Sequence, residues 1–477
     1  MIKFVKKILI KLKSKCHILE ILLYSFFITM FTNYIYADDT IVLKQYDNGA
    51  IYNGQFLNGL QHGEGKYETN DGYEYEGDWF EGRIQGNGKA KYKDGSVYVG
   101  EFDNGQPSGK GIITFLDGGK YEGNWKNGIF NGEGKIFYSD GNFFEGIFLE
   151  GKRNGKGILK SADGYVYNGE WKDDKKNGFA NITYVDGSLY EGLILNGNHN
   201  GEGKFTGYDG LIIEGNWDLG EIKGEVRITQ PNGDIFEGRM INGKKEGLGK
   251  IIFSSGEKYD GYFKNNKRHG KGTFEENDGN KYVGDWYEDK MQGVGKIFFQ
   301  NGSTYEGEMY DDDPHGNGKI LYSDGGYYDG EWKKGLIQGY GEAVYSNGLS
   351  YKGEFKDSKN HGYGTMKYTD GYVYEGNWID GSQEGQGKAI FPDGTIYKGF
   401  FKNGQRDGKG EIIMSDGFKY IGEWKLGEIN GEGKATYTNG DQYIGFFKNG
   451  QREGPGKMLY SDGKELEGEW SKGEVIE

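Results

Sequence analysis

Histidines recur at one place in a repeating phrase, and they are the first residues to test for chemistry. Four of the six, His62, His269, His315 and His361, each precede a glycine. A zinc site or a catalytic centre needs several ligands or acid–base groups at one place. These four lie two or more repeats apart, so no sequence-local cluster forms. We interpret them as turn residues and predict no metal site and no catalytic residue.

Two other motifs lead to the same expectation. The run Asp311-Asp312-Asp313 lacks the glycine placement of a known calcium loop, and a solvated turn is the simpler interpretation. No Gly-x-Ser-x-Gly elbow occurs, and the abundant Gly-x-Gly falls in short strands rather than where a strand meets a helix. We therefore predict that the protein is not an enzyme and binds no cofactor.

The residues that recur belong to a phrase of 23 residues, for example "YEGNWKNGIFNGEGKIFYSDG" from Tyr121. With Tyr121 as position 0, the phrase fills eighteen full units and a truncated nineteenth from residue 52. Glycine stands at +2 in all of them, and a bulky apolar residue follows at +4. Such a strict period indicates one repeat array rather than several separate domains.

Alternation turns this phrase into strands. Positions 0, +2 and +4 share one face of a strand, as do +13, +15 and +17, because strand side chains alternate. "NG" at +6 and +7 and "DG" or "NG" at +19 and +20 predict the turns. Where +7 is not glycine, most of its residues are types that tolerate the left-handed region. The residues are Asp174, Asn266, Asp289, Asp312 and Ser358.

A register follows as a hypothesis. If +4 faces +13, then 0 faces +17 and +3 faces +14, so each large ring covers a glycine and Tyr121 pairs with Tyr138. This register is awkward at Ala180 and Val226, which would face Trp171 and Trp217. It also predicts four ion pairs, namely Asp78–Lys89, Asp285–Lys296, Glu308–Lys319 and Glu423–Lys434.

Composition excludes several classes. Glycine accounts for 89 of 477 residues and proline for only 5, while aromatic residues make up 16%, which suits an ordered chain with many turns. Residues 1–37 hold six lysines and one acidic residue, so the remaining body carries 52 basic and 72 acidic side chains and a net charge of -20. That sign repels phosphate, and we expect no nucleic acid partner.

Residues 1–37 are predicted to be a signal peptide. A basic start is followed by a short apolar core that ends at Ala37, which suits cleavage before Asp38. An uncleaved anchor formed by residues 18–36 is the alternative. The body is expected to be exported, as a secreted, periplasmic or cell-envelope protein. The only cysteine, Cys16, lies in this leader, so the body can form no disulfide.

The repeats resemble the membrane occupation and recognition nexus (MORN) repeat, whose pattern is Y-x-G-x-[FW]-x-N-G-x-x-x-G-x-G. The resemblance covers residues 52–477, after a short N-terminal cap at 38–51. It implies an all-β fold, an elongated single-layer antiparallel sheet of tandem β-hairpin repeats with rings filling one face. It also implies binding and scaffolding roles, sometimes at membranes.

All nine tryptophans stand at +4 and alternate with other residues every 46 positions, except for one gap of 69 between Trp217 and Trp286. The intervening region also loses glycine at Val226 and carries Pro231. We predict a bend or seam near residues 213–258.

The aromatic face is the candidate interaction surface, although its rings are also the only core that a single-layer sheet can have. Two functions remain open: a non-enzymatic scaffold that binds protein or itself, and a peripheral binder of membrane lipid or cell-wall glycan. The candidate residues are Tyr75, Trp79, Tyr121, Trp125, Tyr167, Trp171, Tyr328, Trp332, Tyr374, Trp378, Tyr420 and Trp424.

Overall fold

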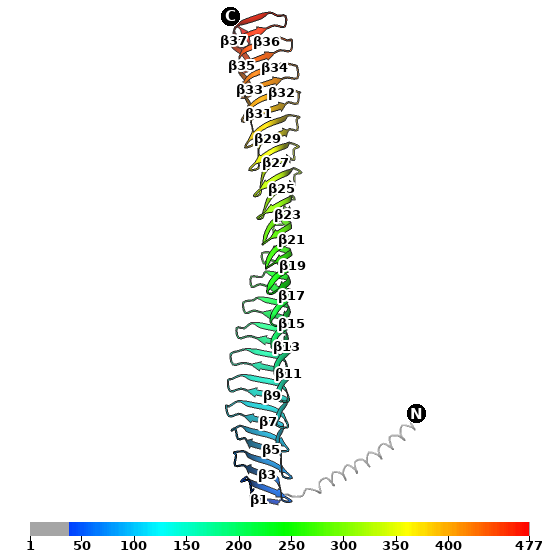
Figure 1. Ribbon diagram of the computed structural model, residues 1–477, viewed down its shortest axis with the longest axis vertical. Helices are drawn as coiled ribbons and strands as arrows, with labels where there is room; N and C mark the ends of the chain where they lie inside the picture. The colour runs from blue at the N-terminus through cyan, green and yellow to red at the C-terminus, as the bar shows by residue number, and fades with distance from the viewer. Residues whose placement is uncertain (1–37, 477) are drawn as a thin grey trace, which may run out of the picture. The chain divides into compact units, whose positions relative to one another are not determined.

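The computed structural model describes residues 38–476, all of them in strands, turns and the loops between strands (Figure 1). These residues form an all-β structure, an open antiparallel sheet of 39 strands in tandem hairpins, which confirms the predicted fold class. The described part contains no helix, and therefore no helix that could cross a membrane. The predicted leader lies outside the described residues.

The chain divides into two compact units. The first is the described part of Met1–Tyr208 together with Trp217–Gly220, and the second is Asp209–Asn216 together with Glu221–Glu477. Each unit has its own aromatic core. The bend expected near residues 213–258 stays a prediction.

The strands of the first part of the chain are β1 (Asp38–Gln45), β2 (Ile51–Leu57), β3 (Leu60–Glu68), β4 (Glu74–Phe80), β5 (Arg83–Lys91), β6 (Val97–Asp103), β7 (Gln106–Thr114), β8 (Lys120–Lys126), β9 (Ile129–Phe137), β10 (Phe143–Leu149), β11 (Lys152–Lys160), β12 (Val166–Lys172), β13 (Lys175–Thr183), β14 (Leu189–Leu195), β15 (Asn198–Thr206) and β16 (Ile212–Asp218). The strands that follow are β17 (Glu221–Thr229), β18 (Ile235–Ile241), β19 (Lys244–Ile252), β20 (Lys258–Lys264), β21 (Lys267–Glu275), β22 (Lys281–Tyr287), β23 (Lys290–Phe298), β24 (Thr304–Tyr310), β25 (Asp313–Leu321), β26 (Tyr327–Lys333), β27 (Leu336–Val344), β28 (Ser350–Lys356), β29 (Lys359–Lys367), β30 (Val373–Ile379), β31 (Ser382–Ile390), β32 (Ile396–Lys402), β33 (Gln405–Ile413), β34 (Lys419–Lys425), β35 (Glu428–Thr436), β36 (Gln442–Lys448), β37 (Gln451–Leu459), β38 (Glu465–Ser471) and β39 (Glu474–Val475).

One repeat is a strand of seven residues and a strand of nine, joined by a two-residue turn. Between β8 and β9 the turn residues are Asn127 and Gly128, with φ of 51° and 79°. These angles match a type I′ turn, whose twist suits a hairpin. The four aspartates and asparagines predicted to tolerate this conformation at +7 have φ between 65° and 75°, which confirms the prediction, and Ser358 adopts it as well with φ of 62°.

The predicted register is wrong by two residues. In the structure Tyr121 pairs with Ile136 and Gly123 pairs with Gly134, so 0 faces +15 and +2 faces +13. The tight turn sets +5 opposite +8, and an irregularity between Gly123 and Trp125 then shifts the pairing. Gly132, with φ of 98°, lies in this irregularity and accommodates the extra residues on β9. Because the error is an even number of residues, the faces were assigned correctly.

The four predicted ion pairs are consequently wrong as well. Lys296 bonds Glu306 of the next repeat at 3.0 Å, and Lys319 lies 3.3 Å from Asp329. Both pairs join +14 of one repeat to +1 of the next, across the longer loop. Neither Ala180 nor Val226 faces a tryptophan, because Ala180 pairs with Gly169 and Val226 with Gly238.

Candidate interaction surfaces

The aromatic core is built from rings that lie across glycine backbone. The Oη–H of Tyr121 donates to the carbonyl oxygen of Asn124 at 2.8 Å. A Cβ added to Gly134 would lie 2.5 Å from the Tyr121 ring, so the ring occupies the space that a side chain would need. Trp125 packs edge-to-face on Tyr121 and on Tyr98 of the preceding repeat, at centroid distances of 5.3 and 5.0 Å. Each core ring therefore connects two repeats.

All twelve predicted interaction residues lie in this core. Their exposed fractions run from 0% to 7%. Trp125 also donates its Nε1–H to the carbonyl oxygen of Gly111 at 3.1 Å, which satisfies the only polar atom of its side chain. Their role as a binding surface stays a prediction, and the structure places them where they hold neighbouring repeats together.

Burial also keeps the core phenols protonated. It raises the pKa of Tyr52 and of Tyr190 to about 12, because ionisation would place a charge among apolar rings. The same cause raises the pKa of Tyr121 further. These hydroxyl groups act as hydrogen-bond donors to backbone rather than as nucleophiles or acids at neutral pH.

Side chains at +9 cover the core from one side. The guanidinium of Arg406 stacks 4.3 Å from the ring centroid of Trp424 and donates from Nη2 to the carbonyl oxygen of Gly427 at 2.7 Å. Arg153, Arg268 and Arg452 repeat the stacking at 4.2 to 4.4 Å from their tryptophans. A cation over an indole face is attracted to it, and the carbonyl oxygen accepts one of the five guanidinium N–H groups.

Rings at +17 and +21 cover the core from the loop side and remain partly exposed. Tyr345 is 43% exposed and Tyr322 39%. Tyr372 lies between two of these rings, with centroids 5.1 Å from Tyr368 and 5.2 Å from Phe391. Sequence reasoning placed +17 opposite position 0 inside the core. The missed signal is that +17 directly precedes the turn, so that its side chain lies at the end of the strand and stays partly exposed to solvent.

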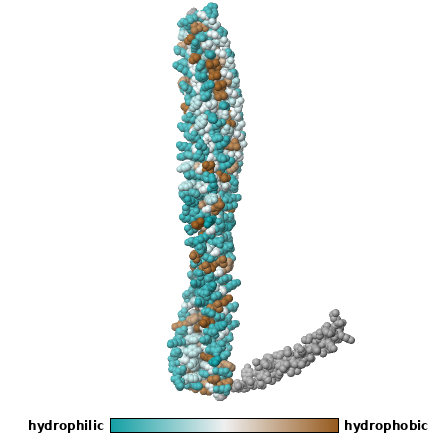
Figure 2. Space-filling model, turned by 45° about the vertical axis from the view of Figure 1, so that its right-hand side comes forward, coloured by the Kyte–Doolittle hydropathy of each residue, from teal (hydrophilic) through white to brown (hydrophobic). Residues whose placement is uncertain are grey.

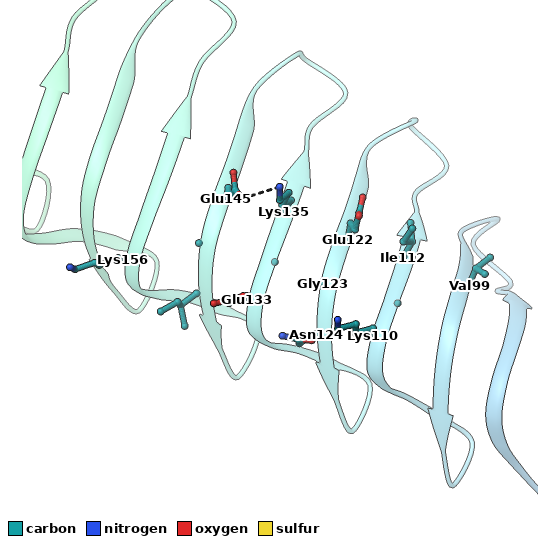
Figure 3. Close-up of a pocket in the computed structure, with 14 residues that line it drawn as sticks. Val99, Lys110, Ile112, Glu122, Gly123, Asn124, Glu133, Lys135, Glu145 and Lys156 are labelled. Carbon is teal, nitrogen blue, oxygen red and sulfur yellow. Dashed lines mark ion pairs between the residues drawn. The ribbon is translucent and has the colours of Figure 1, made fainter.

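The opposite face carries a groove of about 750 Å³ over β6 to β11 (Figure 3). Gly111, Gly123, Gly134 and Gly146 form its floor. Figure 3 shows two rows of side chains beside this floor. One row is Val99, Ile112, Glu122, Lys135 and Glu145, and the other includes Lys110, Asn124, Glu133 and Lys156.

The same positions form grooves elsewhere in both units. A groove of about 900 Å³ lies over β1 to β6, and one of about 560 Å³ over β33 to β37. The glycine rows leave backbone bare while charged and apolar side chains flank it. In the first groove Lys135 and Glu145 form an ion pair at 2.9 Å. Such a mixed surface suits a polypeptide better than a uniformly charged ligand.

The prediction that the four histidines are turn residues is wrong, because each is the third residue of a nine-residue strand, in β3, β21, β25 or β29. Of the three consecutive aspartates, the first two do lie in a hairpin turn. Asp311 and Asp312 form the turn between β24 and β25, with φ of 52° and 75°. Lys290 binds Asp312 at 2.6 Å. His361 Nδ1 lies 3.7 Å from Asp380. Within residues 38–476 no group of three or more potential metal ligands comes together.

The face drawn in Figure 2 is mostly hydrophilic, with apolar residues in small separate patches. It offers no broad apolar area of the kind that marks a membrane-binding or obligate protein surface.

The solved structures that resemble the chain include three remote likenesses. The TCP domain of Drosophila melanogaster SAS-4 is 14% identical over 36% of this chain and 86% of its own, with a TM-score of 0.22. The TCP10 domain of Danio rerio CPAP is 13% identical over 56% and 99%, with a TM-score of 0.15. A virginiamycin B lyase from Staphylococcus aureus is 13% identical over 59% and 90%, with a TM-score of 0.11. At these TM-scores the likenesses carry no argument, and no curated protein matches the chain.

The MORN repeat family model matches the chain seventeen times between residues 52 and 465. The run is interrupted at 213–235, the repeat that has Ile213 in place of the first tyrosine. The matches cover residues 52–72, 75–97, 98–120, 121–143, 144–164, 167–189, 190–212, 236–258, 259–281, 282–304, 305–327, 328–350, 351–371, 374–396, 397–418, 420–442 and 443–465. With this pattern over most of its length and a sheet of tandem hairpins, the chain belongs to the MORN repeat family.

Proposed function

We propose that this protein is an exported, non-enzymatic scaffold that binds protein, or a second copy of itself, through its long repeat sheet. MORN repeats typically form non-catalytic scaffolds and are commonly involved in protein or membrane-lipid interactions. The observation that carries the proposal is the row of grooves on the face opposite the core. There, bare glycine backbone lies between charged and apolar side chains, and this arrangement recurs along each unit.

The core geometry supports a role for this face rather than the aromatic core. The large rings at 0 and +4 are taken up by contacts between repeats, so a partner that reached them would have to displace packed side chains. The groove side chains, in contrast, are exposed: Val99 is 52% and Ile147 42% exposed. Peripheral binding to membrane or cell wall is the alternative, and the net charge of -20 on the body disfavours anionic lipid.

Affinity capture tests the scaffold. The full-length protein, tagged at its C-terminus, is expressed in its own cells and cross-linked, and captured protein, lipid and glycan are identified by mass spectrometry. A stoichiometric protein that is lost from the Glu122→Lys, Glu145→Lys variant supports the groove. The control variant Asp140→Lys, Asp163→Lys places the same charges on exposed loops and should keep the partner. Lipid without protein would overturn the proposal in favour of membrane binding.

Export has its own test. Sequencing of the mature N-terminus should find Asp38 first, and deletion of residues 2–37 should leave the protein in the cytosol. Recovery of the intact leader on a membrane-bound protein would favour the anchor at residues 18–36. An untargeted cytosolic protein would refute export altogether.

A further inference from the structure

The last seven full repeats of the second unit place an apolar side chain at +17, and six of the seven are aromatic. We call this row the rim strip. It consists of Tyr322, Tyr345, Tyr368, Phe391, Met414, Tyr437 and Tyr460. Each follows the nine-residue strand of its repeat and begins the loop to the next strand. The strip therefore runs along the side of the sheet that carries the longer loops, at the ends of the strands.

The strip has a fixed step. Equivalent residues of neighbouring repeats are two strands apart, which is about 9.6 Å at the usual strand spacing. The register is identical from repeat to repeat, as Tyr328 opposite Ile320 and Tyr351 opposite Ala343 illustrate. Seven members thus extend over roughly 58 Å. A ligand that contacts several of them must be a chain with a matching repeat.

The rings are accessible on this side of the sheet. Tyr345 is 43% exposed, Tyr322 39% and Tyr368 37%, whereas Phe391 and Tyr437 are partly buried against the core cluster of the second unit. The three exposed tyrosines can therefore present part of each ring to a ligand without leaving the fold.

Polar groups accompany every ring. Serine or threonine follows at +18, with Pro392 as the exception, and aspartate or asparagine stands at +19. These side chains lie in the exposed turn. Asp370, for example, accepts the backbone N–H of Tyr372 at 2.9 Å, which fixes the carboxylate beside the ring. A carboxylate oxygen can accept more than one hydrogen bond, so the turn still offers acceptors to a hydroxyl group.

We propose that the rim strip binds a neutral, linear β-1,4-linked polysaccharide. The apolar C–H faces of its sugars stack on the rings, and its hydroxyl groups donate to the turn carboxylates. Successive sugars in such a chain are flipped, so its repeat is a disaccharide, whose length matches the step of two strands. A polyanion is repelled by the acidic turns. Insertion of the rim strip into lipid would desolvate the aspartate carboxylates that stand at +19 in five of its seven repeats, which is costly.

This site goes beyond the proposed scaffold but depends on the proposed export for its biological meaning, because such polysaccharides lie outside the cytoplasm. Its test does not depend on export. Binding of cellohexaose and of the hexamer of N-acetylglucosamine to the purified full-length protein is measured by isothermal titration calorimetry, with the disaccharides for comparison. We expect a hexasaccharide to bind at least about tenfold more tightly than its disaccharide, because it spans several rings.

Variants locate the site. Tyr345→Ala with Tyr368→Ala should weaken hexasaccharide binding at least about tenfold, whereas Tyr345→Phe with Tyr368→Phe should retain it, since the stacking rings remain. The matched control is Tyr340→Ala with Tyr363→Ala, which removes two tyrosines of the same repeats that are 53% and 52% exposed on the other face. Hydrogen exchange should show the same fold in all three.

Absence of hexasaccharide binding would overturn the proposal, and so would equal loss in the control variant. If the sugars fail to bind while Tyr345→Ala with Tyr368→Ala loses a protein captured from cells, the strip is a protein surface and the glycan is refuted. Failure of the groove variant Glu122→Lys, Glu145→Lys to lose a captured protein would count against the proposed scaffold but not against the rim strip. The failures of the two proposals are therefore distinguishable.

Discussion

Replacement of Arg406 by methionine tests whether the +9 side chains close the aromatic core. Methionine keeps an apolar cover over Trp424 but removes both the stacked guanidinium, 4.3 Å from the ring centroid, and its hydrogen bond of 2.7 Å to Gly427. The stacking contributes about 1 kcal/mol at a half-exposed site. The hydrogen bond from a charged donor contributes about 1.5 kcal/mol, less some water screening. We therefore expect a loss of roughly 2 kcal/mol in local stability.

Hydrogen exchange is the suitable assay, because a repeat array opens locally and a single global unfolding free energy does not describe it. A loss of 2 kcal/mol corresponds to amide exchange about 30-fold faster in β33 and β34. The control is Lys409→Met, which removes a charge from the same strand on the opposite face, where Lys409 pairs with Glu423. If Arg406→Met and Lys409→Met leave the same protection, the guanidinium does not hold the tryptophan and the reasoning fails.

Three further predictions address the core phenols, the turns and a half-buried histidine. Tyr121→Phe removes the donor to Asn124 and should cost about 1 kcal/mol, seen as faster exchange in β8; unchanged exchange would show that water replaces the bond. Ser358 has φ of 62°, so Ser358→Val should destabilise its hairpin by about 1–2 kcal/mol, as faster hydrogen exchange in β28 and β29 will show. Ser358→Gly should cost less, because it loses only the weak bond from the Ile337 N–H; equal effects of the two would contradict a backbone origin. Burial lowers the pKa of His199, because the folded state favours the neutral ring. The stability contributed by the neutral ring is therefore fully present above the unfolded pKa of about 6.5, and it is lost as pH falls through the lower folded pKa. Exchange in β14 and β15 should accelerate on acidification, and His199→Ile should lack that dependence; an equal pH response in this variant would refute it.

Much of the fold could be predicted because its determinants are local. Alternation assigned Tyr121 and Trp125 to one face, and the turn residues at +7 were recognised because left-handed φ angles restrict residue type. The register could not be predicted in the same way. It depends on the irregularity around Gly132, and glycine there is equally compatible with a regular strand or a loop.

The candidate surfaces divide along the same line. The sequence by itself determined the period, the two faces, the hairpin turns and membership of the MORN repeat family, since each depends on residues close in the chain. Only the tertiary structure decided which rings are buried. Tyr98, Trp125 and the side chains that cover them come from neighbouring repeats, so the exposure of a ring is a property of several repeats together. That is why the tyrosines at 0 lie in the core, while those at +17, of the same residue type, form the exposed rim strip.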